Sequence, residues 1–157
     1  MRVYADTSFL VRLLAHEPGT AEAVAEYRRL GRPALAFLPL HALEAENAIR
    51  ARAFHQRHSA RSRERWQINR EEKAALKRLE HFVTRALLLE TAGDWDAACA
   101  RARDLSRKHT GTTGARSLGL LHLAFALEFR CEVFLSTDEC QAKVAPAEGL
   151  DVLVPGR

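Results

Sequence analysis

The chain has 157 residues, 47% of them hydrophobic and 28% charged, so it is long enough for one globular domain with a buried core. It carries 24 Lys and Arg against 20 Asp and Glu, and the net charge of +4 is compatible with a nucleic-acid partner without requiring one. No apolar run approaches the roughly 18–20 residues of a membrane span. Asp6 and Arg12 interrupt any signal-peptide core, and the three isolated cysteines suggest no disulfide framework. We therefore expect a cytoplasmic protein that does not enter a membrane.

The first stretch of the chain predicts a short buried strand, residues 3–5, that ends on Asp6 and leads directly into a helix with an apolar face. Thr7 and Ser8 are candidates to cap that helix. An acid at the carboxyl end of a first parallel strand lies where open α/β sheets place their ligands. A buried carboxylate needs a partner, and Mg²⁺ and Mn²⁺ prefer oxygen ligands. Asp6 is therefore a candidate metal ligand, while a role as helix cap alone stays open.

A second helix, capped by Thr20 and ending near residue 30, and a second buried strand at residues 34–37 are expected next. A long helix then runs from about residue 40 to 57. The residues at helical spacing that predict its buried face are Leu40, Leu43, Asn47, Ala48 and Ala51. Glu44 lies on the same predicted face, where an acid needs a partner.

Basic residues are dense between positions 55 and 65, where they precede a further helix. They include Arg57, Arg61, Arg63 and Arg65. A solvated helix end is the commoner interpretation of such a run. The functional interpretation is a rim that contacts phosphates, because the guanidinium group is a multidentate donor.

The rest of the chain predicts a helix opened by Asn69, a third strand at 87–89, and a helix capped by Asp94 that runs to about residue 105. Residues 110–114 predict a flexible Gly/Thr-rich loop that lacks the Lys-Ser/Thr ending of a phosphate-binding loop. The helix at 116–128 is apolar nearly all round, which is typical of the middle of a fold, and His122 is expected to be a hydrogen-bonded core residue. The strand at 131–135 ends on Ser136 and Asp138, matching the hydroxyls and acid after the first strand. A helix to about residue 147 and a strand at 151–154 close the chain.

Strands that alternate with helices predict a three-layer α/β/α domain with a central, mainly parallel sheet, and nothing divides residues 1–157 into separate domains. Asp6, Glu44 and Asp138 could then converge at the carboxyl edge of the sheet. Clustered carboxylates repel one another unless a cation is present. Several carboxylates around Mg²⁺ are the usual apparatus for cutting phosphodiesters. An unrelated α/β domain with acids that only cap helices is the plainer alternative.

Four motifs, in this order, resemble those of the PIN-domain ribonucleases, most closely the VapC toxins of toxin–antitoxin pairs. They are residues 3–10 (VYADTSFL), 39–49 (PLHALEAENAI), 116–124 (RSLGLLHLA) and 134–138 (FLSTD). The resemblance implies a PIN-like domain over the whole chain and a metal-dependent endoribonuclease whose Mg²⁺ or Mn²⁺ is held by Asp6, Glu44 and Asp138. The supporting residues that it implies are Thr7, Ser8, Asn47 and Ser136. Its implied partners are an RNA substrate such as tRNA or mRNA and a cognate antitoxin.

The sequence departs from this family at Gly119, which stands immediately before the Leu-Leu-His run where the family normally carries Asp. Glycine inside a helix costs roughly 0.5–1 kcal/mol relative to Ala, so helix stability does not account for it. Three explanations stay open: an enzyme that works with three acids and a more weakly bound metal, a degenerate member that binds RNA or an antitoxin without cutting, and a natural or engineered change that disarms a toxin.

The helices of the N-terminal part of the chain predict more apolar surface than one small domain can cover. A homodimer would cover part of this surface, and an antitoxin helix could lie in a remaining groove. Both partners are also implied by the family resemblance.

Overall fold

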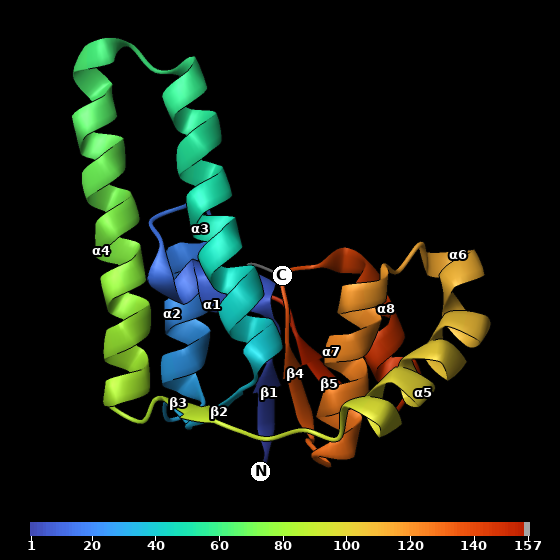
Figure 1. Cartoon of the computed structure of the whole chain (residues 1–157). Coiled ribbons are helices and arrows are strands. Elements are labelled where there is room, and N and C mark those ends of the chain that lie inside the picture. Colours follow the sequence, from blue (N-terminus) through green and yellow to red (C-terminus); the bar gives the residue numbers. More distant parts are fainter. Residues whose placement is uncertain (156–157) are drawn as a thin grey trace. The chain divides into compact units, whose positions relative to one another are not determined.

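The computed structural model describes residues 1–155, which form two compact units (Figure 1). The first unit comprises residues 1–9 and 91–155, and the second comprises residues 10–90. Each unit is built around its own set of parallel strands.

The first unit contains a parallel sheet of three strands in the order β1 (Val3–Ala5), β4 (Val133–Leu135) and β5 (Asp151–Leu153). Tyr4 lies opposite Phe134, and Phe134 lies opposite Val152. All residues of β1 and β4 are buried, as expected for short apolar strands of a parallel sheet.

The helices of the first unit are α5 (Trp95–Leu105), α6 (Gly111–Thr113), α7 (Ser117–Glu128) and α8 (Glu139–Ala147), with one π-helical turn at Ser106–Thr110. Helix α7 packs against both α5 and α8. Its buried residues occupy nearly every side of the helix, which confirms the central place expected from its apolar sequence.

The second unit contains two parallel strands, β2 (Leu35–Phe37) and β3 (Leu88–Glu90). Its helices are α2 (Thr20–Arg29), α3 (Pro39–Ser59) and α4 (Arg65–Thr84), while α1 (Thr7–Leu14) begins in the first unit. Helices α3 and α4 run side by side as a long hairpin joined by a 3₁₀ turn at Ser62–Glu64 (Figure 1).

The buried face predicted for α3 is wrong in part. The buried residues spaced four apart are His41, Ala45, Ile49 and Ala53, joined by Leu40. Leu43, by contrast, is 70% exposed, and Asn47 is exposed as well. Apolar residues are spread around the whole helix, so their spacing did not distinguish the face that packs. Glu44 is half-buried beside this stripe.

Two further local expectations are wrong. Thr20 does not cap α2, because Gly19 with φ 88° precedes the helix while the Thr20 hydroxyl donates to the carbonyl of Ala15. Residues 110–114 are not a flexible loop. The chain is helical from 106 to 113, where the hydroxyls of Thr112 and Thr113 donate to the carbonyl of His109.

The predicted α/β class is confirmed, since helices and strands alternate along the chain and every strand pair is parallel. The cap predicted for α5 is confirmed as well, because the Asp94 carboxylate accepts from the backbone N–H of Ala97. Within residues 1–155, no helix combines the length and the apolar character that crossing a membrane requires.

Candidate active site

The carboxylate of Asp6 is the centre of a buried polar cluster at the carboxyl end of β1. Asp6 is 1% exposed. Its Oδ1 accepts from the Ser8 hydroxyl at 2.7 Å and from the backbone N–H of Phe9 at 2.9 Å. Its Oδ2 accepts from the Ser136 hydroxyl at 2.8 Å and from the Gln141 amide at 2.9 Å, and the Ser8 hydroxyl is 2.9 Å away. A carboxylate has about four lone-pair sites, so protein donors occupy its acceptor capacity.

The hydrogen bond from Phe9 makes Asp6 the residue that caps α1. Thr7 and Ser8 therefore do not have the capping role that the sequence suggested. Their hydroxyls point to other partners, His122 for Thr7 and the Asp6 carboxylate for Ser8. The sequence left the choice among Asp6, Thr7 and Ser8 open, because hydroxyl residues and Asp are equally good caps.

Ser136 joins the ends of β1 and β4. It is fully buried, donates to Asp6, and accepts from the backbone N–H of Asp138 at 2.9 Å. The backbone N–H of Thr137 donates to the Ser8 hydroxyl at 2.9 Å. The two strands are hydrogen-bonded neighbours, so the matching residues that follow them meet at one edge of the sheet, as the sequence predicted.

Asp138 begins α8 as its cap. Its Oδ1 accepts from the backbone N–H groups of Cys140 and Gln141 at 2.8 and 2.9 Å. Its Oδ2 lies 3.9 Å from Arg116, whose side chain is 89% exposed, so this attraction is weak. These interactions hold the Asp138 carboxylate at the start of α8.

His122 lies on α7 and is 2% exposed. Its Nδ1 lies 2.9 Å from the Tyr4 hydroxyl and its Nε2 lies 3.1 Å from the Thr7 hydroxyl, which confirms the predicted hydrogen-bonded core histidine. Burial raises the pKa of Asp6, while the attraction of His122 and hydrogen bonds from Phe9, Ser8 and Ser136 lower it. The hydrogen bonds and the attraction of His122 therefore offset only part of the free-energy cost of burying the charged form of Asp6.

The side chains around Asp6 do not fit a divalent cation as they stand. Each Asp6 oxygen already faces protein donors, including the N–H group of Gln141, and Gly119 supplies no ligand. Among residues 1–155, no group of three or more His, Cys, Asp and Glu side chains could hold a metal ion.

The other predicted site residues lie in the second unit. Glu44 and Asn47 belong to α3. Arg57 pairs with Glu72 at 2.6 Å and also donates to Asn69 at 3.1 Å. Arg61, Arg63 and Arg65 lie at the connection between α3 and α4, and their side chains are exposed.

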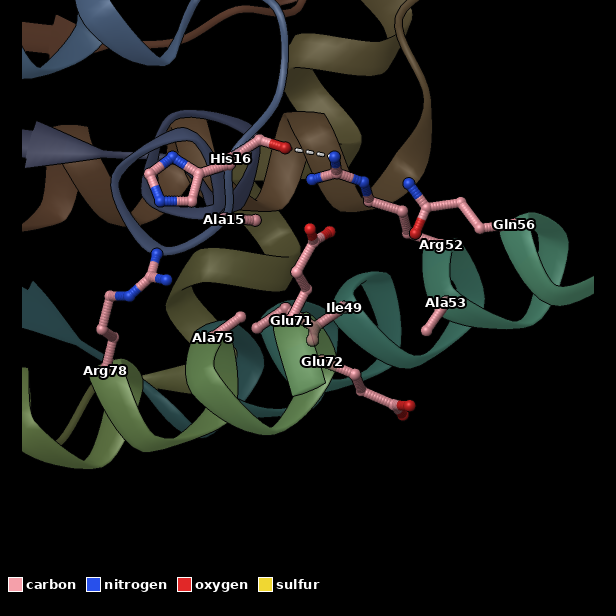
Figure 2. Close-up of a pocket in the computed structure, with 10 residues that line it drawn as sticks. All are labelled: Ala15, His16, Ile49, Arg52, Ala53, Gln56, Glu71, Glu72, Ala75 and Arg78. Carbon is pink, nitrogen blue, oxygen red and sulfur yellow. Dashed lines mark hydrogen bonds between the residues drawn. The ribbon is translucent and has the colours of Figure 1, made fainter. Parts of the chain in front are cut away.

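A small pocket of the second unit lies among α1, α3 and α4 (Figure 2). Its volume of about 30 Å³ has room for a water molecule or two and is too small for a nucleotide. Arg52 and Arg78 on its wall donate to the carbonyls of His16 and Leu14 at the end of α1. These cations stabilise the carboxyl end of a helix, as the direction of its dipole favours.

Sequence reasoning missed Gln141 and Tyr4. Gln141 stands three residues after the capping Asp138, so its side chain belongs to the first turn of α8, which is a weak signal in the sequence. Tyr4 looks like any buried aromatic residue of a strand, and nothing in its sequence context indicates a bond to His122.

Comparisons with known proteins show what this fold is similar to. The sequence model of the PIN domain family matches residues 3–146. FitAcB from Neisseria gonorrhoeae is similar with a TM-score of 0.61 at 14% identity, over 98% of this chain and 97% of that chain. VapBC2 from Rickettsia felis, bound to a DNA fragment from its promoter, is similar with a TM-score of 0.59 at 12% identity, over 99% of both chains. PAE2754 from Pyrobaculum aerophilum has a TM-score of 0.53 at 17% identity, over 97% of this chain and 89% of that chain. No curated protein sequence matches this chain.

Proposed function

This chain belongs to the PIN-domain family, and from that premise we propose that it is the toxin component, of the VapC ribonuclease type, of a toxin–antitoxin pair. The acid and hydroxyl cluster at the carboxyl ends of β1 and β4 is the observation that carries this proposal. The similarity to FitAcB and VapBC2 supports it. In this proposal the whole of residues 1–157 acts as one PIN-like domain.

The catalytic set of the proposal is Asp6, Glu44 and Asp138, with support from Thr7, Ser8, Asn47 and Ser136. PIN nucleases generally use divalent metals, and Mg²⁺ or Mn²⁺ is the ion that this family membership implies. The cluster as it stands holds Asp6 in protein hydrogen bonds, so a metal ion would have to displace at least one of these donors to bind Asp6 directly.

A second candidate function is RNA or antitoxin binding without cleavage. The observation in its favour is that Gly119 leaves the site short of one acid while protein donors fill the acceptors of Asp6. A protein with this function would bind RNA equally well with and without EDTA.

Cleavage of RNA by the purified chain, with Mg²⁺, with Mn²⁺ and with EDTA, distinguishes the two functions when Asp6→Asn is tested beside it. Metal-dependent products that vanish in Asp6→Asn support the ribonuclease. RNA binding without products supports the binding protein. A chain that neither cuts nor binds any RNA refutes the RNA-directed function in both forms.

We propose that the exposed cations Arg61, Arg63 and Arg65 contact RNA phosphates, whereas Arg57 is already paired. Their joint replacement by Gln should weaken RNA binding and flatten its dependence on salt, by about 0.7 in the log–log slope for each phosphate that the variant no longer neutralises. The matched control replaces three other exposed cations of this unit by Gln, namely Arg28, Lys73 and Lys77. An equal weakening in the control would show that only net charge matters.

We propose a homodimer and an antitoxin-binding face on the hairpin of α3 and α4. Large apolar side chains are exposed there: Leu43 at 70%, Phe54 at 51% and Trp66 at 68%. Exposed apolar surface of this kind is typical of interaction sites. Light scattering would report the dimer, and the variant Phe54→Ser should bind a co-expressed antitoxin less well or shift the chain to monomer.

A further inference from the structure

Gln141 is the member of the cluster that the proposed chemistry does not use. It lies in α8, is 6% exposed, and donates from Nε2 to Asp6 Oδ2 at 2.9 Å. Its Oε1 is buried without a hydrogen-bond partner within the described part of the chain. The Gln141 amide group donates a hydrogen bond to Asp6, while its own oxygen accepts none. This is unusual, because buried polar atoms nearly always have a hydrogen-bond partner.

The space that Gln141 occupies is the space that a side chain at position 119 would need. A Cβ atom added to Gly119 would lie 3.0 Å from both Cγ and Cδ of Gln141 and 3.1 Å from its Nε2. Contacts this short force the neighbour to move. Gly119 therefore has a packing reason that the sequence did not show, since its absent side chain lets Gln141 reach Asp6 between α7 and α8.

We propose that Gln141 is a positioning residue that closes Asp6, and that positions 119 and 141 together decide whether Asp6 is open to a divalent cation. The Gln141 amide presents an N–H donor to Asp6 Oδ2 at the place where ion binding would need an open acceptor. A Cβ at position 119 would press on the Gln141 side chain at 3.0–3.1 Å, and in this proposal that contact moves the amide off Asp6. The inference rests on the proposed function only in treating Asp6 as part of the active site.

The Gln141 side chain can rotate away from Asp6, from this closed position, without unfolding α8. The cap of α8 uses the backbone N–H of Gln141 and leaves its side chain out, so the side chain can rotate away while Asp138 keeps its bonds. Rotation would also expose Oε1 to water, which removes the unsatisfied oxygen of the closed position.

Manganese binding to the intact chain tests the proposal, measured by electron paramagnetic resonance without RNA or antitoxin. We expect Gln141→Ala and Gly119→Ala to bind Mn²⁺ at least tenfold more tightly than the unmodified chain, and Gly119→Asp more tightly still. The controls are Gln67→Ala, at an exposed glutamine, and Gly111→Asp, at a helical glycine with open space around it. Both controls should bind Mn²⁺ like the unmodified chain.

Exchange of the Gln141 side-chain amide, followed by nuclear magnetic resonance on the unmodified chain, tests the closed position directly. We expect slow exchange for Gln141 and fast exchange for exposed Gln67. Fast exchange at Gln141, or equal Mn²⁺ affinity in the unmodified chain and Gln141→Ala, would overturn the proposal. Neither measurement involves RNA, so loss of the RNA-directed function would leave this inference standing, and the reverse also holds.

Discussion

The hydroxyl of Ser136 should be the most sensitive single group of the cluster. Ser136→Ala removes a 2.8 Å hydrogen bond to the buried Asp6 carboxylate and a 2.9 Å bond from the backbone N–H of Asp138. A hydrogen bond to a charged group contributes about 1.5–3 kcal/mol and a neutral one about 0.5–1.5 kcal/mol. The expected loss is therefore about 2–4.5 kcal/mol, or about 4–18 °C in melting temperature for a chain of this length.

Urea unfolding followed by circular dichroism measures this loss, with Ser59→Ala as the control. Ser59 is exposed and bonds only within its own helix, to the carbonyl of His55, so its replacement should change stability by less than about 0.5 kcal/mol. Ser8 and Ser136 serve the same carboxylate, so Ser8→Ala and Ser136→Ala should be coupled by about 0.5–3 kcal/mol in a double-mutant cycle. A Ser136→Ala variant as stable as the control would refute the assigned network.

Three more outcomes are expected. Tyr4→Phe removes the 2.9 Å bond to buried His122 and should lower stability by about 1–3 kcal/mol in urea unfolding, and an unchanged midpoint would contradict this role. Burial raises the pKa of Asp6, so the folded chain binds a proton on the Asp6 carboxyl more tightly than the unfolded chain does. The contribution of Asp6 to the free energy of unfolding therefore falls as pH rises through the pKa that Asp6 has in the folded chain. Asp6→Asn should therefore gain stability relative to the unmodified chain as pH rises above about 4, and a stability difference that is flat with pH, from melting scans at several pH values, would disprove it. Asp94→Ala removes the cap on α5 and should cost about 1 kcal/mol, measured the same way, whereas Asp96→Ala should cost less.

The energetics of Gln141 explain why a single residue at position 119 could control the site. Its bond to the charged Asp6 contributes about 1.5–3 kcal/mol, while its unsatisfied buried oxygen costs about 1–3 kcal/mol. The unsatisfied oxygen therefore offsets part of what the bond to Asp6 contributes. In the proposal made above, the contact of a Cβ at position 119 with Cγ and Cδ of Gln141 at 3.0 Å acts against this bond.

Much of the local structure was predictable, because it depends on neighbours in the sequence. The strand at Val3–Ala5, the apolar α7 and the cap at Asp94 all follow from short apolar runs or from a single capping side chain. The sequence left alternatives open where several local solutions were equally good. Asp6, Thr7 and Ser8 are all acceptable caps, and only the bond from Phe9 identifies Asp6.

The sequence by itself determined the α/β class, the order of the strands and the two strand ends that carry Asp6 and Asp138. Side-chain period and strand-end composition are properties of adjacent residues, so they can be read without knowledge of distant contacts. Only the tertiary structure decided that Gln141, 135 residues beyond Asp6, donates to the Asp6 carboxylate, and that Gly119 leaves the room that the Gln141 side chain fills. A contact of this kind depends on how α7 packs against α8 and on where β1 ends, and no local pattern encodes where two distant side chains meet.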